Sequence, residues 1–437
     1  MNYKIKIILL YIVGIVIIQL PLQAQTAQKI SLQQAIDLSI KTSNNLKIAG
    51  SKVLQASADV QEAKDRKLPN ASVSASYLRL SSANINLKSA QNSNRPSPKV
   101  NQAVYGIANV TMPLYSGGRI KYGIESAEYL EKAAMLNVEN DKEAVVYNTI
   151  QAYTNLYKSS KTLTVIKENL NASVQRDSLF SRLEQNGILA RNDLLKAQLT
   201  TSNIELSLLD AQNNFNIATI NMALLLGLQE NTSIEVDSNF VNVPLQLKPF
   251  IEMENMALQN RKDAQAIAFQ KRAAAVGVKI AKSEAYPTIA LTGGYIAADI
   301  PKLLTVTNAV NIGLGVQYNI ASLWKNNTKL TQARAREVQL SATESLINDG
   351  IKLQLNKDYQ NYLFAQKKID VYEKSITQAT ENYRITKNKY DNNLVTITDL
   401  LEADISLLQA KLNASVAKAD AALAYNKILS TTGTLSK

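Results

Sequence analysis

The chain has no cysteine and no histidine among its 437 residues, and it has one tryptophan. The first two absences exclude thiol catalysis, histidine acid–base catalysis and the usual zinc sites, because each of these needs one of the missing side chains. The sequence also lacks a glycine-rich stretch that ends in Gly-Lys-Ser or Gly-Lys-Thr, the motif that binds nucleotide phosphates. We therefore expect neither an enzyme nor a bound cofactor or metal.

Long hydrophobic runs are confined to the N-terminus. Lys4 and Lys6 precede an apolar stretch over 7–20. This stretch and a small-residue cleavage site at 22–24 predict a secretory signal peptide over 1–24. An uncleaved membrane anchor is the alternative, although the stretch is shorter than a typical span. No later stretch predicts a transmembrane helix, so a mature chain that enters a membrane must do so as a β-barrel.

Acidic residues are outnumbered, with 36 Asp and Glu against 48 Lys and Arg and a formal net charge of +12 at pH 7. Such a balance often indicates nucleic-acid binding. Here the basic residues are interleaved with acids along the whole chain, a pattern typical of hydrated helix faces. We expect no nucleic-acid partner.

Proline is scarce, and its positions divide the chain. None of the nine prolines lies between residues 114 and 243, and none follows Pro301. Because proline breaks helix interiors, these two stretches are free to be helical, and they are rich in good helix formers. From Arg119 to about Asn186 a single helix is predicted, with a length of about 100 Å at the rise of an α-helix.

Short segments near the prolines alternate between apolar and small or polar residues. In the clearest of them Ile312, Leu314 and Val316 alternate with Gly313 and Gly315. This two-residue period predicts β-strands, and about ten residues per segment suit a tilted membrane strand. A soluble sheet with one hydrated face is the alternative. The four predicted strands form two hairpins, at about 70–114 and about 287–320.

The sequence contains one unit twice. Adding 206 to a residue number maps Gly227 onto Gly433, and adding 218 maps Pro69 onto Pro287. The two offsets differ by 12, which places the longer loop in the first hairpin. Each copy is predicted as helix, strand, strand, long helix, turn and helix. The predicted parts are a first repeat at 25–230, an equatorial linker at 231–250 and a second repeat at 251–437.

Local signals mark where the helices start, stop and pack. Ser31 followed by Gln34 forms a capping box that starts the first helix, and Gly187 and Asn393 stop the two long helices. In the last helix alanine recurs every seven residues, a strict repeat that predicts a supercoiled seam between neighbouring helices. These alanines are Ala403, Ala410, Ala417 and Ala424.

The first hairpin ends in a stretch that reads Met112-Pro113-Leu114-Tyr115-Ser116-Gly117-Gly118-Arg119. Paired glycines permit a tight turn from strand into helix. The stretch resembles the strand-to-helix junction of the TolC family of outer-membrane efflux proteins, with Pro113, Gly117 and Gly118 as junction residues. The resemblance covers 31–433. It implies a mainly α-helical homotrimer, in which each protomer gives four strands to a shared membrane β-barrel that continues as a long α-helical periplasmic tunnel.

The same resemblance implies a function and a location. It implies an export duct in the outer membrane of a Gram-negative bacterium, extending into the periplasm. Such a duct belongs to a tripartite efflux or type I secretion system and passively conducts small molecules or polypeptides. The implied partners are outer-membrane lipid, a periplasmic adaptor (membrane fusion) protein and an inner-membrane pump of the RND or ABC type.

The resemblance also assigns a role to the turns that end the two long helices. These tip turns, 186–190 and 392–396, are implied to contact the adaptor. The second turn carries asparagine where the family has glycine. The residues concerned are Gly187, Ile188 and Leu189 in the first turn and Asn393, Leu394 and Val395 in the second.

A periplasmic gate is implied beside the second tip turn. Asp399 and Glu402 match positions that form acidic rings in some family members. Three copies would favour cations and would raise the pKa of their own carboxyl groups by mutual repulsion. A helix cap formed by the same two residues is the alternative, and both roles are compatible.

The resemblance further implies a tether that holds the closed tip. Tyr390 matches a tyrosine that ties the tip to a neighbouring helix, and Asp193 matches its acidic partner. Val395 replaces the expected basic partner, which leaves other residues such as Arg191 as substitutes.

Two other classes of function remain open on the sequence. A surface adhesin or coiled-coil fibre explains the helices and the signal peptide, but it does not explain two hairpins at equivalent points of a duplication. A periplasmic hydrolase that uses carboxylates needs a clustered acid pair, whereas the acids here are dispersed along the chain. The export duct accounts for all of these features.

Overall fold

The computed structural model describes residues 28–83, 100–242, 246–301 and 303–435. The predicted signal peptide and most of the long loop of the first hairpin lie outside these residues.

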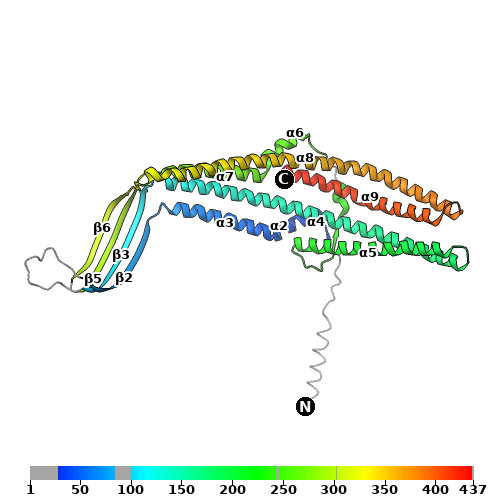
Figure 1. The fold of residues 1–437 in the computed structure, drawn as a ribbon, viewed down its shortest axis with the longest axis horizontal. Helices are drawn as coiled ribbons and strands as arrows, with labels where there is room; N and C mark the ends of the chain where they lie inside the picture. Colours follow the sequence, from blue (N-terminus) through cyan, green and yellow to red (C-terminus); the bar gives the residue numbers. More distant parts are fainter. Residues whose placement is uncertain (1–27, 84–99, 243–245, 302, 436–437) are drawn as a thin grey trace, which may run out of the picture. The chain divides into compact units, whose positions relative to one another are not determined.

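Helices and strands follow the predicted order twice (Figure 1). The first copy contains α2 (Leu32–Thr42), α3 (Asn44–Asp65), β2 (Asn70–Ala83), β3 (Val100–Tyr115), α4 (Arg119–Gln185) and α5 (Arg191–Leu225). The second contains α6 (Phe250–Asn260), α7 (Lys262–Ser283), β5 (Thr288–Ile300), β6 (Leu304–Gln317), α8 (Ser322–Asp391) and α9 (Ile397–Thr431). Outside the copies lie β1 (Gln28–Ile30), β4 (Ile234–Val236) and the 3-10 helix η2 (Ser238–Asn242).

The two copies match in length as well as in order. Adding 206 to the bounds of α5 gives the bounds of α9, and the long helices α4 and α8 contain 67 and 70 residues. Gly227 and Gly433, which follow α5 and α9, both have positive φ, +69° and +66°. Ser31 starts α2 through the predicted capping box with Gln34. The duplicated order of helices and strands is therefore confirmed.

The first helix of each copy differs from the prediction, because it is two helices. α2 and α3 are separated by Ser43, which has an extended ψ of 117°. Serine competes with the helix by hydrogen-bonding nearby backbone and favours helix ends. In the second copy α6 and α7 are separated by Arg261, with ψ of 125°, whose side chain pairs with Asp263 across the break (Nη2–Oδ2 2.5 Å).

By its contacts the chain forms two compact units, and each contains parts of both copies. The sheet unit comprises residues 45–141 and 255–353, and the tip unit comprises the segments up to 44, 142–254 and from 354 onward. The predicted boundaries describe the sequence repeats, and they stay a prediction. None of the described helices combines the length and the apolar character needed to cross a membrane.

The sheet unit contains one antiparallel sheet in the order β2-β3-β5-β6. The register places Val73 beside Ala108, Ala108 beside Tyr295 and Tyr295 beside Val310, so that these residues share one face. This face is apolar but open to solvent in the single chain, with Val310 and Ile312 77% and 81% exposed. The opposite face carries small and polar residues, among them Ser72, Asn109, Thr292 and Asn311.

The tip unit has a core around Tyr153, which is fully buried among apolar side chains. Its hydroxyl donates a hydrogen bond to the carbonyl oxygen of Ile30 (2.8 Å) and accepts one from the backbone N–H of Asp237 (2.7 Å). Ile30 belongs to β1, which pairs in parallel with β4 of the linker. One side chain of α4 thereby holds both the N-terminal strand and the linker.

Replacement of Tyr153 by Phe removes this hydroxyl and leaves the Ile30 carbonyl and the Asp237 N–H without their partner. We expect a loss of about 1–3 kcal/mol in the free energy of unfolding, measured by urea denaturation followed by circular dichroism. Tyr157→Phe is the control, because Tyr157 packs on the same ring, Phe240. An equal loss in both variants would contradict the role of the Tyr153 hydroxyl.

The same variant has a distinct pH dependence. Burial raises the pKa of Tyr153 to about 12, whereas a free tyrosine titrates at about 10. The folded state favours the neutral phenol, so its stabilising contribution is complete below about pH 10 and is lost as the pH rises through about 12. Tyr153→Phe should therefore weaken the alkaline decline of stability.

Candidate functional site

Both long helices end in the same kind of turn. Gly187 and Asn393 take left-handed φ values of +72° and +58°. The N–H of the following residue, Ile188 or Leu394, donates to the carbonyl oxygen five residues earlier at 2.9 Å. This is the Schellman arrangement that ends a helix, and it confirms the two predicted stops.

Each tip turn presents one large apolar side chain to solvent. Ile188 and Leu394, which correspond in the two copies, are 73% and 72% exposed. The next residues, Leu189 and Val395, are half-buried, and Leu189 packs into the core below. Exposed apolar groups at a turn suit a protein–protein contact.

An apolar core joins the two tip turns within one protomer. The rings of Phe180 on α4 and Tyr390 on α8 lie 5.9 Å apart between centroids. Around them gather residues of both copies, so that the hairpins α4–α5 and α8–α9 pack against each other. The buried members are Phe180, Leu194, Ala197, Ile397, Leu400 and Leu401, with Leu183, Leu189, Tyr383 and Tyr390 at the border.

Asp399 caps helix α9, as one of the two sequence interpretations predicts. The Thr396 hydroxyl and backbone N–H donate to Asp399 Oδ2 at 2.6 and 2.8 Å, and the Asp399 N–H donates to Thr396 Oγ1 at 3.3 Å. The predicted partner is wrong, because a capping box joins the N-cap to the third helical residue and Glu402 lies three residues further along. Glu402 is exposed on the same helix.

The cap fixes the charge state of Asp399 in the protomer. Hydrogen bonds from the Thr396 side chain and backbone hold the pKa of the Asp399 carboxyl below its usual range. The carboxylate is therefore charged at neutral pH, as an acidic ring requires. The rise in pKa expected from repulsion between copies concerns the assembled ring and stays a prediction.

The predicted tether between Tyr390 and Asp193 is not formed by a hydrogen bond among the described residues. Burial raises the pKa of Tyr390, and the nearby negative charge of Asp193 adds to the rise. The Asp193 carboxylate lies 3.6 Å from Lys196 Nζ instead. Arg191, the possible substitute, pairs with Glu184 of its own hairpin at 3.2 Å.

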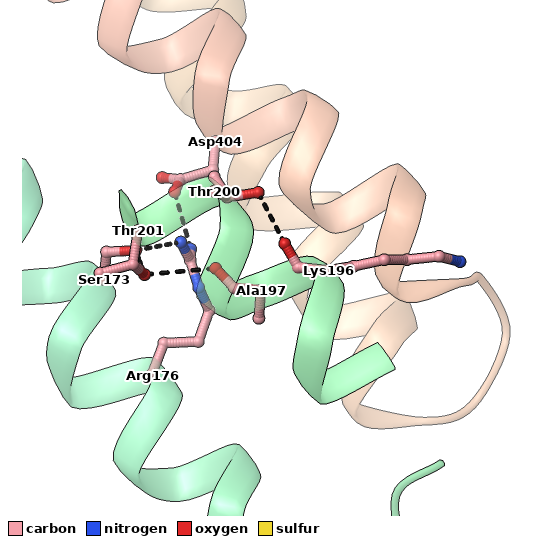
Figure 2. A network of polar contacts seen from close by, with 7 residues as sticks. All are labelled: Ser173, Arg176, Lys196, Ala197, Thr200, Thr201 and Asp404. Atoms are coloured by element: carbon pink, nitrogen blue, oxygen red, sulfur yellow. Dashed lines mark hydrogen bonds and ion pairs between the residues drawn. The ribbon is translucent and has the colours of Figure 1, made fainter. Parts of the chain in front are cut away.

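A buried ion pair holds the two hairpins together, and the sequence reading missed it. Arg176 Nη1 on α4 donates to Asp404 Oδ2 on α9 at 2.7 Å, and Arg176 Nη2 donates to Ser173 Oγ at 2.9 Å. Ser173 Oγ and Thr201 Oγ1 on α5 are 2.6 Å apart. Figure 2 shows this network spanning three helices. With side chains 11% and 12% exposed, the pair is the most buried one in the described part of the chain.

A signal for this pair is present in the sequence. Ile397, Leu400 and Leu407 are buried along α9 at spacings of three and seven, and Asp404 occupies the position between them. A charged residue at such a seam position needs a buried partner. Its identity could not be read from the spacing, because Arg176 is 228 residues away.

The predicted strand-to-helix junction has the geometry that glycine requires. Gly117 and Gly118 have φ values of +62° and +85°. A Cβ atom on Gly117 would lie 2.7 Å from the Cβ of Tyr286 and 2.8 Å from the Ser283 carbonyl oxygen. Pro113 pairs with Ala290 just before a register shift in β3, where a residue without an N–H is tolerated.

The site consists of contact surfaces and fixed charges. Among the described residues no group of acidic side chains is placed to hold a metal ion. The arrangement can present apolar tips to a partner, place carboxylates near the second turn and hold two hairpins together. None of these features makes or breaks a covalent bond.

Several outer-membrane channels of known structure have the same fold as this chain. The outer-membrane channel OprN shares 17% identity and a TM-score of 0.78, with 92% of this chain and 89% of that chain covered. The outer membrane protein VceC of Vibrio cholerae is 18% identical with a TM-score of 0.77, and the match covers 92% of this chain and 96% of VceC. The Campylobacter jejuni CmeC channel is 19% identical with a TM-score of 0.77, and the match covers 92% of this chain and 86% of CmeC. This likeness shows the fold.

Sequence comparison identifies the family. The model of the family "Outer membrane efflux protein" matches residues 29–228 and 254–434, and the chain belongs to that family. Toxin and drug export protein A of Aggregatibacter actinomycetemcomitans is 22% identical over 70% of this chain and 69% of its own length. Nodulation protein T of Rhizobium leguminosarum bv. trifolii is 24% identical over 68% of this chain and 65% of its own length.

The family defines the general function. The chain is an outer-membrane efflux channel with a periplasmic part, and its family is one of channels and not of enzymes. Channels of this family are the outer-membrane components of export systems and work with partner proteins. The predicted family, fold class and location are confirmed.

Gly117 and Gly187, which both have positive φ, make a matched pair of tests. At Gly187 an added Cβ would meet nothing within 4 Å, so Gly187→Ala should cost only the backbone strain, about 1–2 kcal/mol. Gly117→Ala carries a similar strain and also a clash with backbone, so its loss of stability should be clearly larger. Thermal unfolding in detergent measures both, and equal losses would contradict the tight junction.

Proposed function

We propose that the chain is the outer-membrane duct of a tripartite efflux or type I secretion system, and that it acts as a homotrimer that conducts cargo passively. The sheet carries this proposal. Its apolar face is uncovered in one protomer, and its polar face is too hydrophilic to meet lipid. Four strands from each of three copies, closed into one barrel, put the apolar face toward lipid and the polar face toward water.

Aromatic side chains at one end of the sheet support contact with lipid. Tyr115 ends β3, Tyr286 precedes β5, Tyr318 follows β6, and Trp324 lies in the first turn of α8. All four side chains are exposed to solvent in the single protomer. Trp324, the sole tryptophan of the sequence, has 64% of its surface exposed. Tyrosine and tryptophan favour the boundary between lipid and water. This end of the sheet would then lie at the periplasmic face of the membrane.

The tip turns are the proposed contact with a periplasmic adaptor. Ile188 and Leu394 offer exposed apolar groups, while Gly187 and Asn393 fix the turns that present them. An inner-membrane pump of the RND or ABC type would supply the energy through that adaptor, because the sequence has no nucleotide-binding loop. One relative is named for the export of toxins and drugs, and both cargo classes, small toxic compounds and polypeptides, are compatible with the proposed duct.

Asp399 and Glu402 are the proposed acidic ring of the gate, and Tyr390 and Asp193 are its proposed tether. Both acids lie exposed on the first two turns of α9, beside the second tip turn. Three copies would concentrate six carboxylates around a narrow axis, which favours cations over anions. The cap on Asp399 keeps it charged at pH values where free aspartate is protonated.

The direct test of the proposed function is reconstitution. We expect the purified mature chain to run as a detergent-stable trimer by light scattering and to conduct ions across a planar lipid bilayer. An adhesin or fibre would give helices without conductance. A monomer that stays soluble without detergent and forms no pore would overturn the proposal.

The acidic ring has its own test in the reconstituted channel. Asp399→Asn with Glu402→Gln should lower the cation-to-anion permeability ratio by roughly two- to fivefold, measured as the reversal potential in a salt gradient. Glu205→Gln with Asp210→Asn is the control, since it removes the same charge from exposed positions of α5. An unchanged ratio in the first variant would remove the gate role from these residues.

A further inference from the structure

The helices of the sheet unit meet the sheet along one of its ends. The antiparallel register pairs Asn70, at the start of β2, with Thr111, near the end of β3, and it pairs Thr288 of β5 with Gln317 of β6. The helices α3 and α7 therefore end, and the helices α4 and α8 begin, at the same edge of the sheet (Figure 1). We call this edge the junction edge.

Exposed basic side chains gather at the junction edge, and each of the four helix ends contributes at least one of them. We call the following residues the basic belt: Lys67 after α3, Arg119 and Lys121 in the first turn of α4, Lys282 in the last turn of α7 and Lys325 in the first turn of α8. Within the described ranges of the chain, none of these side chains forms an ion pair. The belt is therefore a surface of positive charge that the single protomer leaves open.

Acidic residues near the junction edge already have other partners. Glu62 of α3 pairs with Arg66 at 2.9 Å, and Glu284, which follows α7, pairs with Lys329 of α8 at 2.6 Å. These pairs leave Glu62 and Glu284 unable to neutralise the belt without giving up a closer partner. A negatively charged partner has to come from outside the protomer.

Helix stability does not explain the basic belt either. The first turns of α4 and α8 contain no acidic residue, although the positive end of the helix dipole favours acids there and disfavours cations. Arg119, Lys121 and Lys325 therefore lie where a positive charge slightly destabilises its own helix. An anionic partner would offset this effect.

The residues beside the belt indicate lipid as that partner. Leu114 continues the apolar face of the sheet up to the junction edge, and Tyr115 follows it directly. In the second copy Tyr318 follows β6, and Trp324 directly precedes Lys325. The chain thus passes from apolar strands through exposed aromatic residues to basic residues. Acyl chains, the interface that favours tyrosine and tryptophan, and charged headgroups follow one another in the same order in a membrane.

We propose that the basic belt binds the negatively charged headgroups of phospholipids in the periplasmic leaflet of the outer membrane. This rests on the proposed function, because the sheet must lie in the membrane with its junction edge at the periplasmic face. The guanidinium of Arg119 can bind a lipid phosphate through two parallel hydrogen bonds, and the lysines act as point charges. Three copies would join their belts into a ring of positive charge that fixes the depth of the duct in the leaflet.

The sole tryptophan of the sequence reports on this boundary, because Trp324 lies beside Lys325. The parent trimer is placed in vesicles of equal parts phosphatidylglycerol and phosphatidylcholine, with bromine on the acyl chains of one lipid or the other. We expect brominated phosphatidylglycerol to quench the Trp324 fluorescence more strongly, corresponding to a roughly two- to fivefold enrichment of this lipid at the boundary. Added salt should weaken the difference, because it screens exposed charges.

Neutralising the belt should remove the preference. Arg119→Gln, Lys121→Gln, Lys282→Gln and Lys325→Gln, combined in one variant, should make the two brominated lipids quench Trp324 equally. A belt variant that assembles and keeps the full preference of the parent would contradict the role of these side chains.

The matched control removes the same charge from exposed positions of α4 and α8 in the tip unit, and it should keep the preference of the parent. It combines Lys167→Gln, Arg182→Gln, Lys374→Gln and Lys387→Gln. A control that loses the preference as fully as the belt variant would reduce the effect to net charge and would contradict a localised belt.

The parent chain alone separates failure of this inference from failure of the proposed function. Equal quenching by both brominated lipids in the parent overturns headgroup binding and leaves the duct in the membrane. Quenching by neither lipid means that Trp324 does not reach lipid, and it contradicts the proposed placement of the sheet. Basic side chains that faced the lumen would act on ion selectivity instead. A belt variant with an altered reversal potential in a neutral bilayer, and an unchanged lipid preference, would place the belt in the lumen and overturn the inference.

Discussion

Backbone hydrogen bonding at the edges of the sheet is the constraint on which the rest of the molecule depends. Among the described residues β2 and β6 each pair on one side only, which leaves a row of N–H and C=O groups on the other side. Within lipid such groups have no water to bind, so they must find another strand. The apolar face formed by residues such as Ile312 has the complementary requirement, because it needs lipid or protein to cover it. One chain alone meets neither requirement, and the proposed homotrimer would meet both.

The two copies of the repeat share one backbone plan but differ in their side chains. Matching bounds of α5 and α9 show that both hairpins are built to one plan. The side chains along them have diverged, so that the buried ion pair joins α4 to α9, while all four helices contribute side chains to the apolar core near the tips. Small residues such as Ala403 and Ala417 let the joined helices approach closely.

Parts of the candidate site that depend on residues close together in the sequence were predicted correctly, whereas the contact between distant residues was missed. Local geometry was correct: Gly117, Gly187 and Asn393 have the positive φ that their turns need, and Asp399 caps α9. The predicted capping partner of Asp399, Glu402, was wrong, and the observed partner Thr396 lies only three residues before Asp399. The Arg176–Asp404 pair was missed, because it joins residues 228 positions apart whose meeting depends on the rotation of two long helices about their axes.

The sequence by itself determined the order of helices and strands, the duplication, the ends of the long helices and the family, because these depend on periodicity, proline positions and short motifs that act within a few residues. It could not determine the breaks at Ser43 and Arg261, the hold of Tyr153 on the N-terminal strand and linker, or the partner of Asp404. Only the tertiary structure decided those. A contact between distant segments depends on which helix faces meet, and a one-residue change in helical register turns a side chain by about 100° and replaces one partner by another.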